Sequence, residues 1–319
     1  MSDYSIRKLN ENEFHLLIPL MQDCFGLNFD VAYFKWKFVD NPAGFVVGFI
    51  AEATNGEVAA YYGVIPELYS IEGKETTIYQ SCDTMTHSRH RRKGLFQKLA
   101  LHCYDYLKQN DKLFVIGFGG GQSTPGFLKF GWLHIFDVRY YFFPRQFAFF
   151  KRALDARVKP LTDYKPIEAL LLKSNAGATI HSHKTLRNFT WRIANPANHY
   201  QVLGYQSATG YTSYICYYIT TDKIVLFDFY FATPAEGKAL LRELKNKLPG
   251  SGYKGIISFV QQGSAYATAL KQVGFIANPF TKGPLSEKVP FIFYAPQQQL
   301  DKYKAPHNWQ IGSFDHDAL

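Results

Sequence analysis

A block near the start of the chain returns in its second half, and this repeat limits the possible folds more than any other feature. Residues 34–43 (FKWKFVDNPA) are matched by residues 189–197 (FTWRIANPA). The spacing then continues, because Gly56 in a strand–turn–strand pattern corresponds to Gly210 in a second one. A chain of 319 residues has about the length of two ordinary domains. The sequence therefore predicts two domains of similar plan, residues 1–150 and 151–319.

The stretch from Ile78 to Asn110 predicts an apolar strand, a basic loop and an amphipathic helix. Apolar side chains recur every four residues from Leu95 to Leu107, as on one face of a helix. The loop, residues 89–94 (RHRRKG), brings several cations to the start of this helix. The first amides of a helix lack intrahelical acceptors, and the helix dipole favours an anion there. This arrangement favours a diphosphate and hence a cofactor that carries a nucleotide.

The basic loop has other interpretations. Runs of this kind are common on solvated surfaces, in nuclear-import signals and in nucleic-acid patches. The position of the loop between a strand and a helix, with Gly94 at the junction, favours phosphate binding. The sequence has no Walker-type loop, and its single glycine here does not match the three of a dinucleotide fingerprint.

Residues 82–96 (CDTMTHSRHRRKGLF) resemble motif A of the GNAT acetyltransferases. In that family a strand leads into an Arg/Gln-x-x-Gly-x-Gly/Ala turn that holds the pyrophosphate of acetyl-CoA. Arg91, Gly94 and Phe96 occupy the three patterned positions, so a phenylalanine replaces the last small residue. The Gly-Leu-Phe ending is similar to the branch that includes the enhanced intracellular survival acetyltransferases. The resemblance implies an α/β (α+β) chain of two tandem GNAT-like domains, each a mixed, mostly antiparallel twisted sheet flanked by helices.

The resemblance also implies a set of contacts to acetyl-CoA as co-substrate, with no metal. The second family signature, a short helix ending in Gly-Phe, is matched by residues 125–132 (PGFLKFGW), which follow a glycine cluster. The residues expected to line the cofactor are Met85, Thr86, His87, Arg89, Arg91, Arg92, Lys93, Gly94, Leu95, Phe96, Gly120, Gly121, Ser123 and Phe127.

The chemistry implied by the family is direct attack of an amine on the thioester in a ternary complex. The main chain of residues 85–87 is expected to polarise the thioester carbonyl. Asp83 is the first candidate for the general base, with Tyr79 and His87 as alternatives, although Asp83 also suits a structural role at a strand end.

The proton donor departs from the family pattern. Many members carry a tyrosine four residues before the glycine of Gly-Phe, where this chain has Phe127. A phenyl ring donates no proton, so the leaving thiolate must be protonated by water or by another residue. Tyr61 and Tyr62 are the candidates in the sequence.

The two halves differ in charge at the corresponding junction. Residues 232–238 (ATPAEGK) follow the predicted strand 224–231 and carry one lysine, one glutamate and no arginine. They offer a diphosphate a weaker field than residues 89–94 do. We expect the first domain to hold the cofactor and the second to shape the acceptor groove.

The composition predicts a soluble cytoplasmic enzyme. Hydrophobic residues make up 47% of the chain, yet no apolar run is long enough to span a bilayer, and the N-terminus has no signal pattern. The net charge of +9 suits anionic ligands. Residues 315–317 (DHD) predict a charged chain end rather than a metal site. The cysteines have no metal-binding spacing and are expected to be reduced: Cys24, Cys82, Cys103 and Cys216.

Three functions from different classes remain open on the sequence. The first is an acyl-CoA-dependent N-acyltransferase that acts on a small amine, an amino sugar or a peptide. The second is a peptidoglycan-bridge aminoacyl transferase, which also pairs GNAT-like domains but uses aminoacyl-tRNA. The third is a non-catalytic protein that binds CoA or nucleic acid. No membrane partner is expected, and a nucleic acid is expected only under the tRNA alternative.

Overall fold

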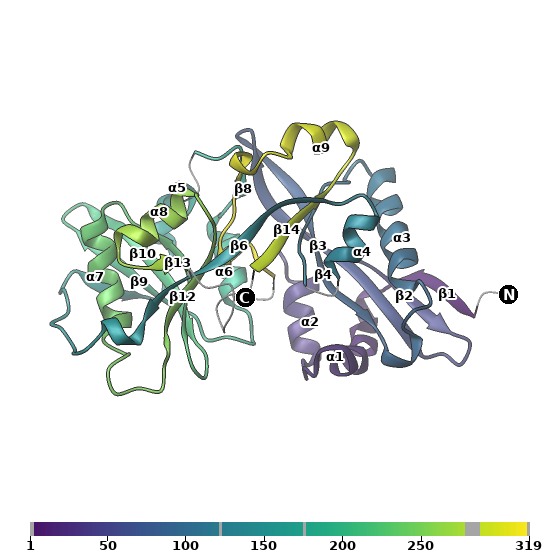
Figure 1. Cartoon of the computed structure of the whole chain (residues 1–319), viewed down its shortest axis with the longest axis horizontal. Coiled ribbons are helices and arrows are strands. Elements are labelled where there is room, and N and C mark those ends of the chain that lie inside the picture. Colours follow the sequence, from purple (N-terminus) through teal and green to yellow (C-terminus); the bar gives the residue numbers. More distant parts are fainter. Residues whose placement is uncertain (1–2, 121–122, 175–176, 278–287, 318–319) are drawn as a thin grey trace.

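The computed structural model describes residues 3–120, 123–174, 177–277 and 288–317. Within these ranges the strands join into one 15-stranded sheet with helices on both faces. Figure 1 shows two lobes, with β6 and β14 running between them. This mixed α/β architecture is the fold class that the sequence predicts.

The first half of the chain forms the lobe that carries the N-terminus (Figure 1). Its elements are β1 (Tyr4–Lys8), α1 (Leu17–Phe25), α2 (Val31–Phe38), β2 (Val47–Ala53), β3 (Val58–Ile71), β4 (Lys74–Thr86), α3 (Leu95–Gln109), β5 (Val115–Phe118), α4 (Thr124–Lys129) and β6 (Leu133–Pro144). Strands β1 to β4 are antiparallel, whereas β5 lies parallel to β4.

The second half repeats this plan. Its elements are β7 (Val158–Leu161), α5 (Glu168–Lys173), β8 (Ile180–Ser182), α6 (Leu186–Ile193), β9 (Gln201–Ser207), β10 (Gly210–Ile219), β11 (Ile224–Tyr230), α7 (Pro234–Lys245), β12 (Gly255–Gln261), α8 (Ala265–Gln272), β13 (Ile276–Ala277), β14 (Lys288–Tyr294), α9 (Gln297–Tyr303) and β15 (Trp309–Gln310). Here β9 to β11 are antiparallel, and β12 lies parallel to β11.

The strand order is symmetrical about the middle of the sheet. It runs β1-β2-β3-β4-β5-β14-β6-β12-β11-β10-β9-β7. Each half therefore gives its last long strand to the other half: β14 pairs with β5, and β6 pairs with β12. The two exchanged strands also pair with each other. This exchange leaves β5 and β12 no free edge on that side. Strands from both halves of the chain belong to this one sheet, so strand pairing does not separate residues 1–150 from residues 151–319. The domain boundary at residue 150 stays a prediction.

Helix α3 behaves as its apolar spacing predicts. It begins at Leu95, and Asn110 is its C-cap residue. Its apolar face is buried against β2, β3 and β5 in one core, together with Phe127 and Trp132. Helices α1 and α2 cover the opposite face of the same strands in a second core. The strands that precede α3 are thus held between two helical layers.

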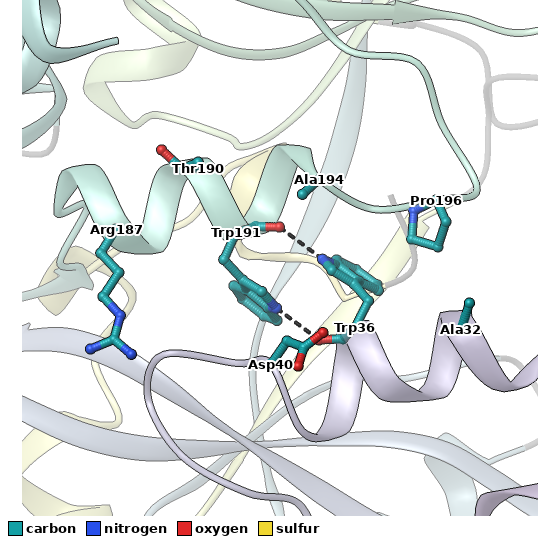
Figure 2. A pocket seen from close by; sticks show the side chains of 8 residues that line it. All are labelled: Ala32, Trp36, Asp40, Arg187, Thr190, Trp191, Ala194 and Pro196. Atoms are coloured by element: carbon teal, nitrogen blue, oxygen red, sulfur yellow. Dashed lines mark hydrogen bonds between the residues drawn. The ribbon is translucent and has the colours of Figure 1, made fainter. Parts of the chain in front are cut away.

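The repeated block places two tryptophans against each other. Trp36 Nε1 donates a hydrogen bond to the main-chain oxygen of Trp191, and Trp191 Nε1 donates one to that of Trp36, both at 2.8 Å (Figure 2). Their rings stack with centroids 5.4 Å apart. This reciprocal contact joins α2 to α6, so the two copies of the block contact each other across the lobes. No helix in the described ranges is both long and apolar enough to traverse a bilayer.

Candidate active site

Strands β4 and β5 part at the point where the basic loop follows. Their parallel ladder runs from Tyr79 and Val115 to Ser81 and Gly117, and no further pair joins them in the described residues. Strand β4 continues to Thr86 through a bulge at which Asp83 has a φ of 47°. Strand β5 pairs on its other side with β14. The main chain of β4 beyond Ser81 can therefore serve a ligand instead of a neighbouring strand.

The loop between β4 and α3 has the backbone of an anion site. Arg92 has a φ of 63°, and Gly94, the N-cap residue of α3, has a φ of 71°. Left-handed residues in such a turn make successive amides converge, as in anion-binding nests. A Cβ built on Gly94 would meet no atom within 4 Å, so the side-chain position of this residue is not packed. The glycine is needed for its conformation, not for lack of space.

The cations of this loop divide into two groups. Arg89 forms an ion pair with Glu57, and His90 Nε2 lies 3.3 Å from the same carboxylate. The hydrogen bond from Arg89 lowers the pKa of Glu57, with a further contribution from His90. In contrast, Arg91, Arg92 and Lys93 are exposed and make no ion pair within the described part of the chain. These three side chains are the ones that the turn can offer to a diphosphate.

Two further residues hold the loop in shape. The carboxylate of Asp23 accepts hydrogen bonds from the main-chain N–H of Ser88 at 2.7 Å and from its hydroxyl at 2.8 Å. These bonds lower the pKa of Asp23. His87 Nδ1 accepts a hydrogen bond from the N–H of Arg89 at 3.2 Å. The imidazole of His87 thus has a structural contact, and its role in catalysis stays a prediction.

Asp83 belongs to a buried ionic cluster that the sequence did not predict. Lys37 Nζ lies 2.7 Å from Asp83 Oδ2 and 2.9 Å from Asp317 Oδ2. Burial alone would lower the pKa of Lys37, but the two carboxylates outweigh it and raise that pKa well above its ordinary value. Burial raises the pKa of Asp83 against the opposing effect of Lys37. Lys37 is therefore an ammonium shared by two carboxylates, and the three groups together carry an excess of negative charge.

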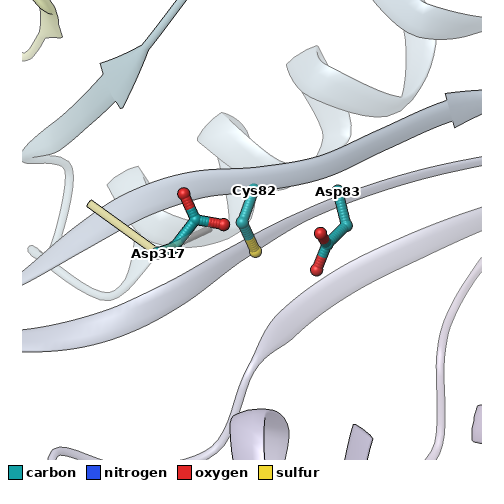
Figure 3. A group of neighbouring side chains, drawn as sticks. All are labelled: Cys82, Asp83 and Asp317. Carbon is teal, nitrogen blue, oxygen red and sulfur yellow. The ribbon is translucent and has the colours of Figure 1, made fainter. Parts of the chain in front are cut away.

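Cys82 adjoins this cluster, as Figure 3 shows. Its sulfur and carboxylate oxygens of Asp83 and Asp317 lie within 4.8 Å of one another, a grouping that could hold a metal ion. However, the Lys37 ammonium already contacts both carboxylates. Burial also raises the pKa of the Cys82 thiol, which disfavours the thiolate that a metal needs. The donor set therefore fits an ion pair better than a metal.

Residues 315–317, which the sequence predicts to be charged, pack into the interior of the molecule. Asp315 is buried, and it accepts a hydrogen bond from Tyr69 at 2.8 Å. His316 stacks on Phe118 with ring centroids 4.4 Å apart, and burial lowers the pKa of His316 to about 4. The N–H of Asp317 donates to Gln80 at 2.9 Å. The burial of this segment was not predicted, because it depends on contacts with residues far away in the chain.

Tyr61 is buried beside β4, on the same face as Cys82 and Met85. Its ring covers Gly63, where a Cβ would come within 2.0 Å of the phenolic oxygen. That oxygen has no hydrogen-bond partner among the described residues, and burial raises the pKa of Tyr61. Tyr61 therefore keeps its proton, as a donor must. Tyr62, in the opposite core, has its hydroxyl 2.9 Å from that of Tyr104.

The phenylalanine that replaces the family's small residue has a structural explanation. The rings of Phe96 and Phe127 meet edge to face with centroids 5.0 Å apart. A Cβ on Gly126 would lie 2.9 Å from the Phe96 ring, so the missing side chain at Gly126 makes room for this ring. Leu95 and Phe127 are buried in the same core, which leaves mainly their main chain for a ligand.

The glycine loop after β5 is partly described. The N–H of Gly120 donates to Ser123 Oγ at 3.2 Å, and Thr124 N donates to Gly120 O at 3.0 Å. Ser123 is the N-cap residue of α4. Gly121, also expected to line the cofactor, lies outside the described residues.

A further acidic residue was missed by the sequence analysis. Glu67 lies on β3, two residues before Tyr69. Burial raises the pKa of Glu67 to about 8, although Arg192 and Lys37 act to lower it. The charges of Asp315 and Asp317 raise it further. No local pattern around Glu67 could have shown this, since the neighbouring charges come from the second half and the chain end.

In the second half, residues 311–313 of the chain bond to β12 at the place where β11 and β12 part. The ladder between β11 and β12 ends at Val225 and Ile257. Beyond it, Phe259 N donates to Ser313 Oγ at 2.9 Å, and Gln261 N donates to the oxygen of Ile311, also at 2.9 Å. The segment before the chain end therefore occupies the edge of β12 that faces β11.

The N-terminus of α7 likewise has its hydrogen-bonding groups and its dipole occupied by residues of the chain itself. Thr233 caps the helix by accepting a hydrogen bond from the N–H of Glu236. The Glu236 carboxylate in the first turn supplies the anion that the helix dipole favours. Its Oε2 accepts hydrogen bonds from the hydroxyls of Thr212 and Ser213, at 2.8 and 2.5 Å. This junction offers an incoming diphosphate a carboxylate in place of the three exposed cations before α3.

Comparison with known proteins agrees with this geometry. Residues 5–135 match the family model described as the acetyltransferase (GNAT) domain. No curated protein matches the chain by sequence. The first half is therefore similar to the acetyltransferase (GNAT) domain, and the match covers the whole of the strand–loop–helix region described above.

Solved structures resemble the chain over most of its length. A probable N-acyltransferase of unknown function from Enterococcus faecalis V583 is 11% identical, with a TM-score of 0.70, over 91% of this chain and 72% of that one. A GCN5-related N-acetyltransferase from Anabaena variabilis is 13% identical, with a TM-score of 0.66 and the same coverages, 91% and 72%.

Saccharomyces cerevisiae N-myristoyltransferase with bound myristoyl-CoA is 11% identical, with a TM-score of 0.63, over 92% of this chain and 79% of that one. At these identities the similarity concerns the fold. The chain thus shares the mixed α/β fold of these structures over most of its length.

Proposed function

We propose that the protein is an acyl-CoA-dependent N-acyltransferase that moves an acetyl group from acetyl-CoA to an amine by direct attack in a ternary complex. The observation that carries the proposal is the coincidence of two features in the first half. The strands β4 and β5 diverge, and the three unpaired cations of the next loop stand at the N-terminus of α3. In the second half β11 and β12 also part, but residues 311–313 bond the edge of β12 and Glu236 lies in the first turn of α7.

The donor would be held by main chain and by cations. Amides of residues 92–96 and the side chains of Arg91, Arg92 and Lys93 would bind the diphosphate. The main chain of β4 at Met85 and Thr86 would hold the thioester carbonyl and stabilise the negative charge that develops on its oxygen. The N–H of His87 already donates to the oxygen of Ala59 at 2.9 Å.

The ionic cluster supports an amine as the acceptor. Two carboxylates share the single ammonium of Lys37, so the excess negative charge attracts a protonated amine to the bulge of β4. Asp83 is the proposed proton acceptor, and Tyr61 the proposed source of the proton for the leaving thiolate. Asp317 then acts by positioning Lys37 against Asp83.

The remaining properties follow from the resemblance to the enhanced intracellular survival branch of tandem-domain enzymes. We infer that the second half shapes the acceptor groove and that the protein works in the cytoplasm. The four free cysteines suit a reducing compartment.

Calorimetric titration with acetyl-CoA tests the donor site. Arg91→Glu/Arg92→Glu should weaken binding by on the order of a hundredfold, because two charge-assisted contacts become repulsive. The control is Lys238→Glu, near the start of α7, and it should leave the affinity unchanged. Equal affinity in the double variant and the wild type would refute this placement of the diphosphate.

The acceptor and donor classes need a separate assay. Release of free CoA thiol should be measured with a panel of amines, and with acetyl-CoA against longer acyl-CoA donors. Amine-dependent release that is fastest with acetyl-CoA supports the proposal. Faster thiol release with a long-chain acyl-CoA would show that the preferred donor is not acetyl-CoA. Transfer from aminoacyl-tRNA with no thiol release would favour the peptidoglycan-bridge reaction.

A further inference from the structure

A cluster of exposed phenylalanines lies far from the candidate active site, on the segment that connects β6 to β7. Phe147, Phe149 and Phe150 are 57, 82 and 65% exposed, and Leu154 is 54% exposed. Four large apolar side chains within eight residues form an exposed patch, whereas isolated exposed apolar residues need no explanation.

Basic side chains surround these rings. Arg145, Lys151 and Arg152 belong to the same segment and are exposed. Helix α7 lies against it, since Arg242 donates a hydrogen bond to the oxygen of Ala153 at 2.9 Å, and Asn246 bonds the main chain of Arg152 through both its amide atoms. The segment is therefore held on α7 by its main chain while its side chains stay exposed.

The positive charge on α7 adds to that of the segment. Lys245 lies over the Phe143 ring at 4.1 Å from its centroid. Burial lowers the pKa of Lys245 to about 8, and the positive charges of Lys238, Arg152 and Arg242 lower it further. The nearby carboxylate of Asp155 is held by Arg157 at 2.8 Å. The cations thus exceed the free carboxylates around the exposed rings.

We propose that this surface docks on an anionic lipid bilayer. It consists of Phe147, Phe149, Phe150, Leu154, Arg145, Lys151, Arg152, Lys238, Arg242 and Lys245, and we call it the Phe149 patch. Phenyl and leucyl side chains enter the boundary between headgroups and acyl chains, while lysine and arginine bind the anionic headgroups. The sequence analysis expected no membrane partner, and this proposal departs from that expectation.

Nucleic acid fits the patch less well. Single strands are bound by aromatic rings that stack on bases along a basic groove. Leu154 offers no stacking surface, and every aromatic residue of the patch is a phenylalanine. A bilayer accommodates all four apolar side chains. The patch lies beside α7, at the end of the molecule remote from α3 (Figure 1), so docking leaves the loop before α3 accessible.

Co-sedimentation with vesicles tests the proposal. The wild-type protein should bind vesicles of phosphatidylcholine mixed with phosphatidylglycerol, bind phosphatidylcholine vesicles weakly, and dissociate as salt is added. Phe149→Ser/Phe150→Ser should reduce binding to the mixed vesicles by about tenfold or more. Lys151→Glu/Arg152→Glu should reduce it by a similar factor.

Matched controls separate the patch from the overall charge of the protein. Leu101→Ser and Lys108→Glu alter an exposed leucine and an exposed lysine on α3, and both should bind vesicles as the wild type does. Unchanged thermal unfolding of each variant shows that it folds.

Three outcomes would overturn the proposal. The first is equal vesicle binding by the phenylalanine variant and the wild type, since net charge alone would then explain binding. The second is no binding to mixed vesicles together with salt-sensitive binding of single-stranded RNA. The third is no binding to mixed vesicles together with a dimer that the phenylalanine substitutions dissociate.

Discussion

The two halves share one plan of strands but differ at the place where parallel strands diverge. In the part of the chain that the structure describes, no pair joins β4 to β5 beyond Ser81 and Gly117, and three exposed cations follow β4. Between β11 and β12 the chain's own segment from Ile311 to Ser313 bonds the edge of β12, and Glu236 occupies the start of α7. The comparison teaches that this fold can keep or lose a diphosphate site without changing its architecture. The presence of the site depends on which groups bond to the N-terminus of one helix (α3 or α7) and to the edge of one strand (β4 or β12).

We expect the largest difference between the two halves when their buried lysines, Lys37 and Lys184, are replaced by methionine. Lys184 lies 2.5 Å from Asp228 and 2.8 Å from the Tyr266 hydroxyl, fully buried. Lys184→Met would leave Asp228 as an uncompensated buried charge and should cost about 3–5 kcal/mol of stability. Urea unfolding measures this loss. Lys37→Met should lower acyl transfer more than Lys184→Met does when both are assayed well below their melting temperatures. The reverse order would mean that the second half carries the chemistry.

Glu67 makes the interface between the lobes sensitive to pH. Its pKa in the folded protein is raised to about 8 from an ordinary value of 4.5. The protonated form contributes stability that is fully present below pH 4.5 and is lost as the pH rises to about 8. Glu67→Gln should therefore become more stable than the wild type as the pH rises through this window, by a few kcal/mol at most.

Thermal unfolding between pH 5 and about 9 tests this effect. Glu11→Gln, on an exposed residue, is the control and should show no such trend. If the melting temperatures of Glu67→Gln and the wild type differ by the same amount at every pH, the pKa of Glu67 is not raised.

The segment of residues 311–313 that bonds to β12 should contribute a moderate amount to the free energy of unfolding. Ser313 Oγ accepts from the N–H of Phe259 at 2.9 Å and lies 3.2 Å from its oxygen. Ser313→Ala leaves that buried amide without its partner and should cost about 1–3 kcal/mol. Chemical denaturation reports the loss. Ser70→Ala, at another buried serine, is a useful reference, and a smaller loss for Ser313 would weaken the claim that this segment completes β12.

The smallest effects are expected at the tryptophan contact. Trp36→Phe and Trp191→Phe each remove one of two equivalent hydrogen bonds and should cost about 1 kcal/mol each beyond the loss of ring area. The two values should be similar, since the contact is reciprocal. Strongly unequal losses in equilibrium unfolding would show that the lobes are not joined symmetrically.

The sequence predicted those parts of the structure that depend on local patterns. Helix α3 begins at Leu95 because its apolar residues recur every four positions. Both hairpins turn at Gly56 and Gly210, which have positive φ. The repeated block likewise indicated two copies of one plan. Such features depend on residues close together in the chain.

Other features depend on distant residues and could not be predicted. The exchange of β6 and β14 requires knowledge of which edges stay unpaired. The contact of Lys37 with Asp317 joins residues 280 positions apart. Tyr61 was a fair candidate by sequence, but only the structure shows its hydroxyl buried over Gly63. Likewise, the phenylalanine at position 96 could be understood only once it was seen above Gly126.

Hydrogen–deuterium exchange with and without acetyl-CoA tests the central claim most directly, because it locates the ligand on the chain. We expect acetyl-CoA to slow exchange of amides in residues 82–97 and to leave residues 226–238 unchanged. Protection of residues 226–238, or acetyl-CoA binding that protects neither segment, would contradict the account.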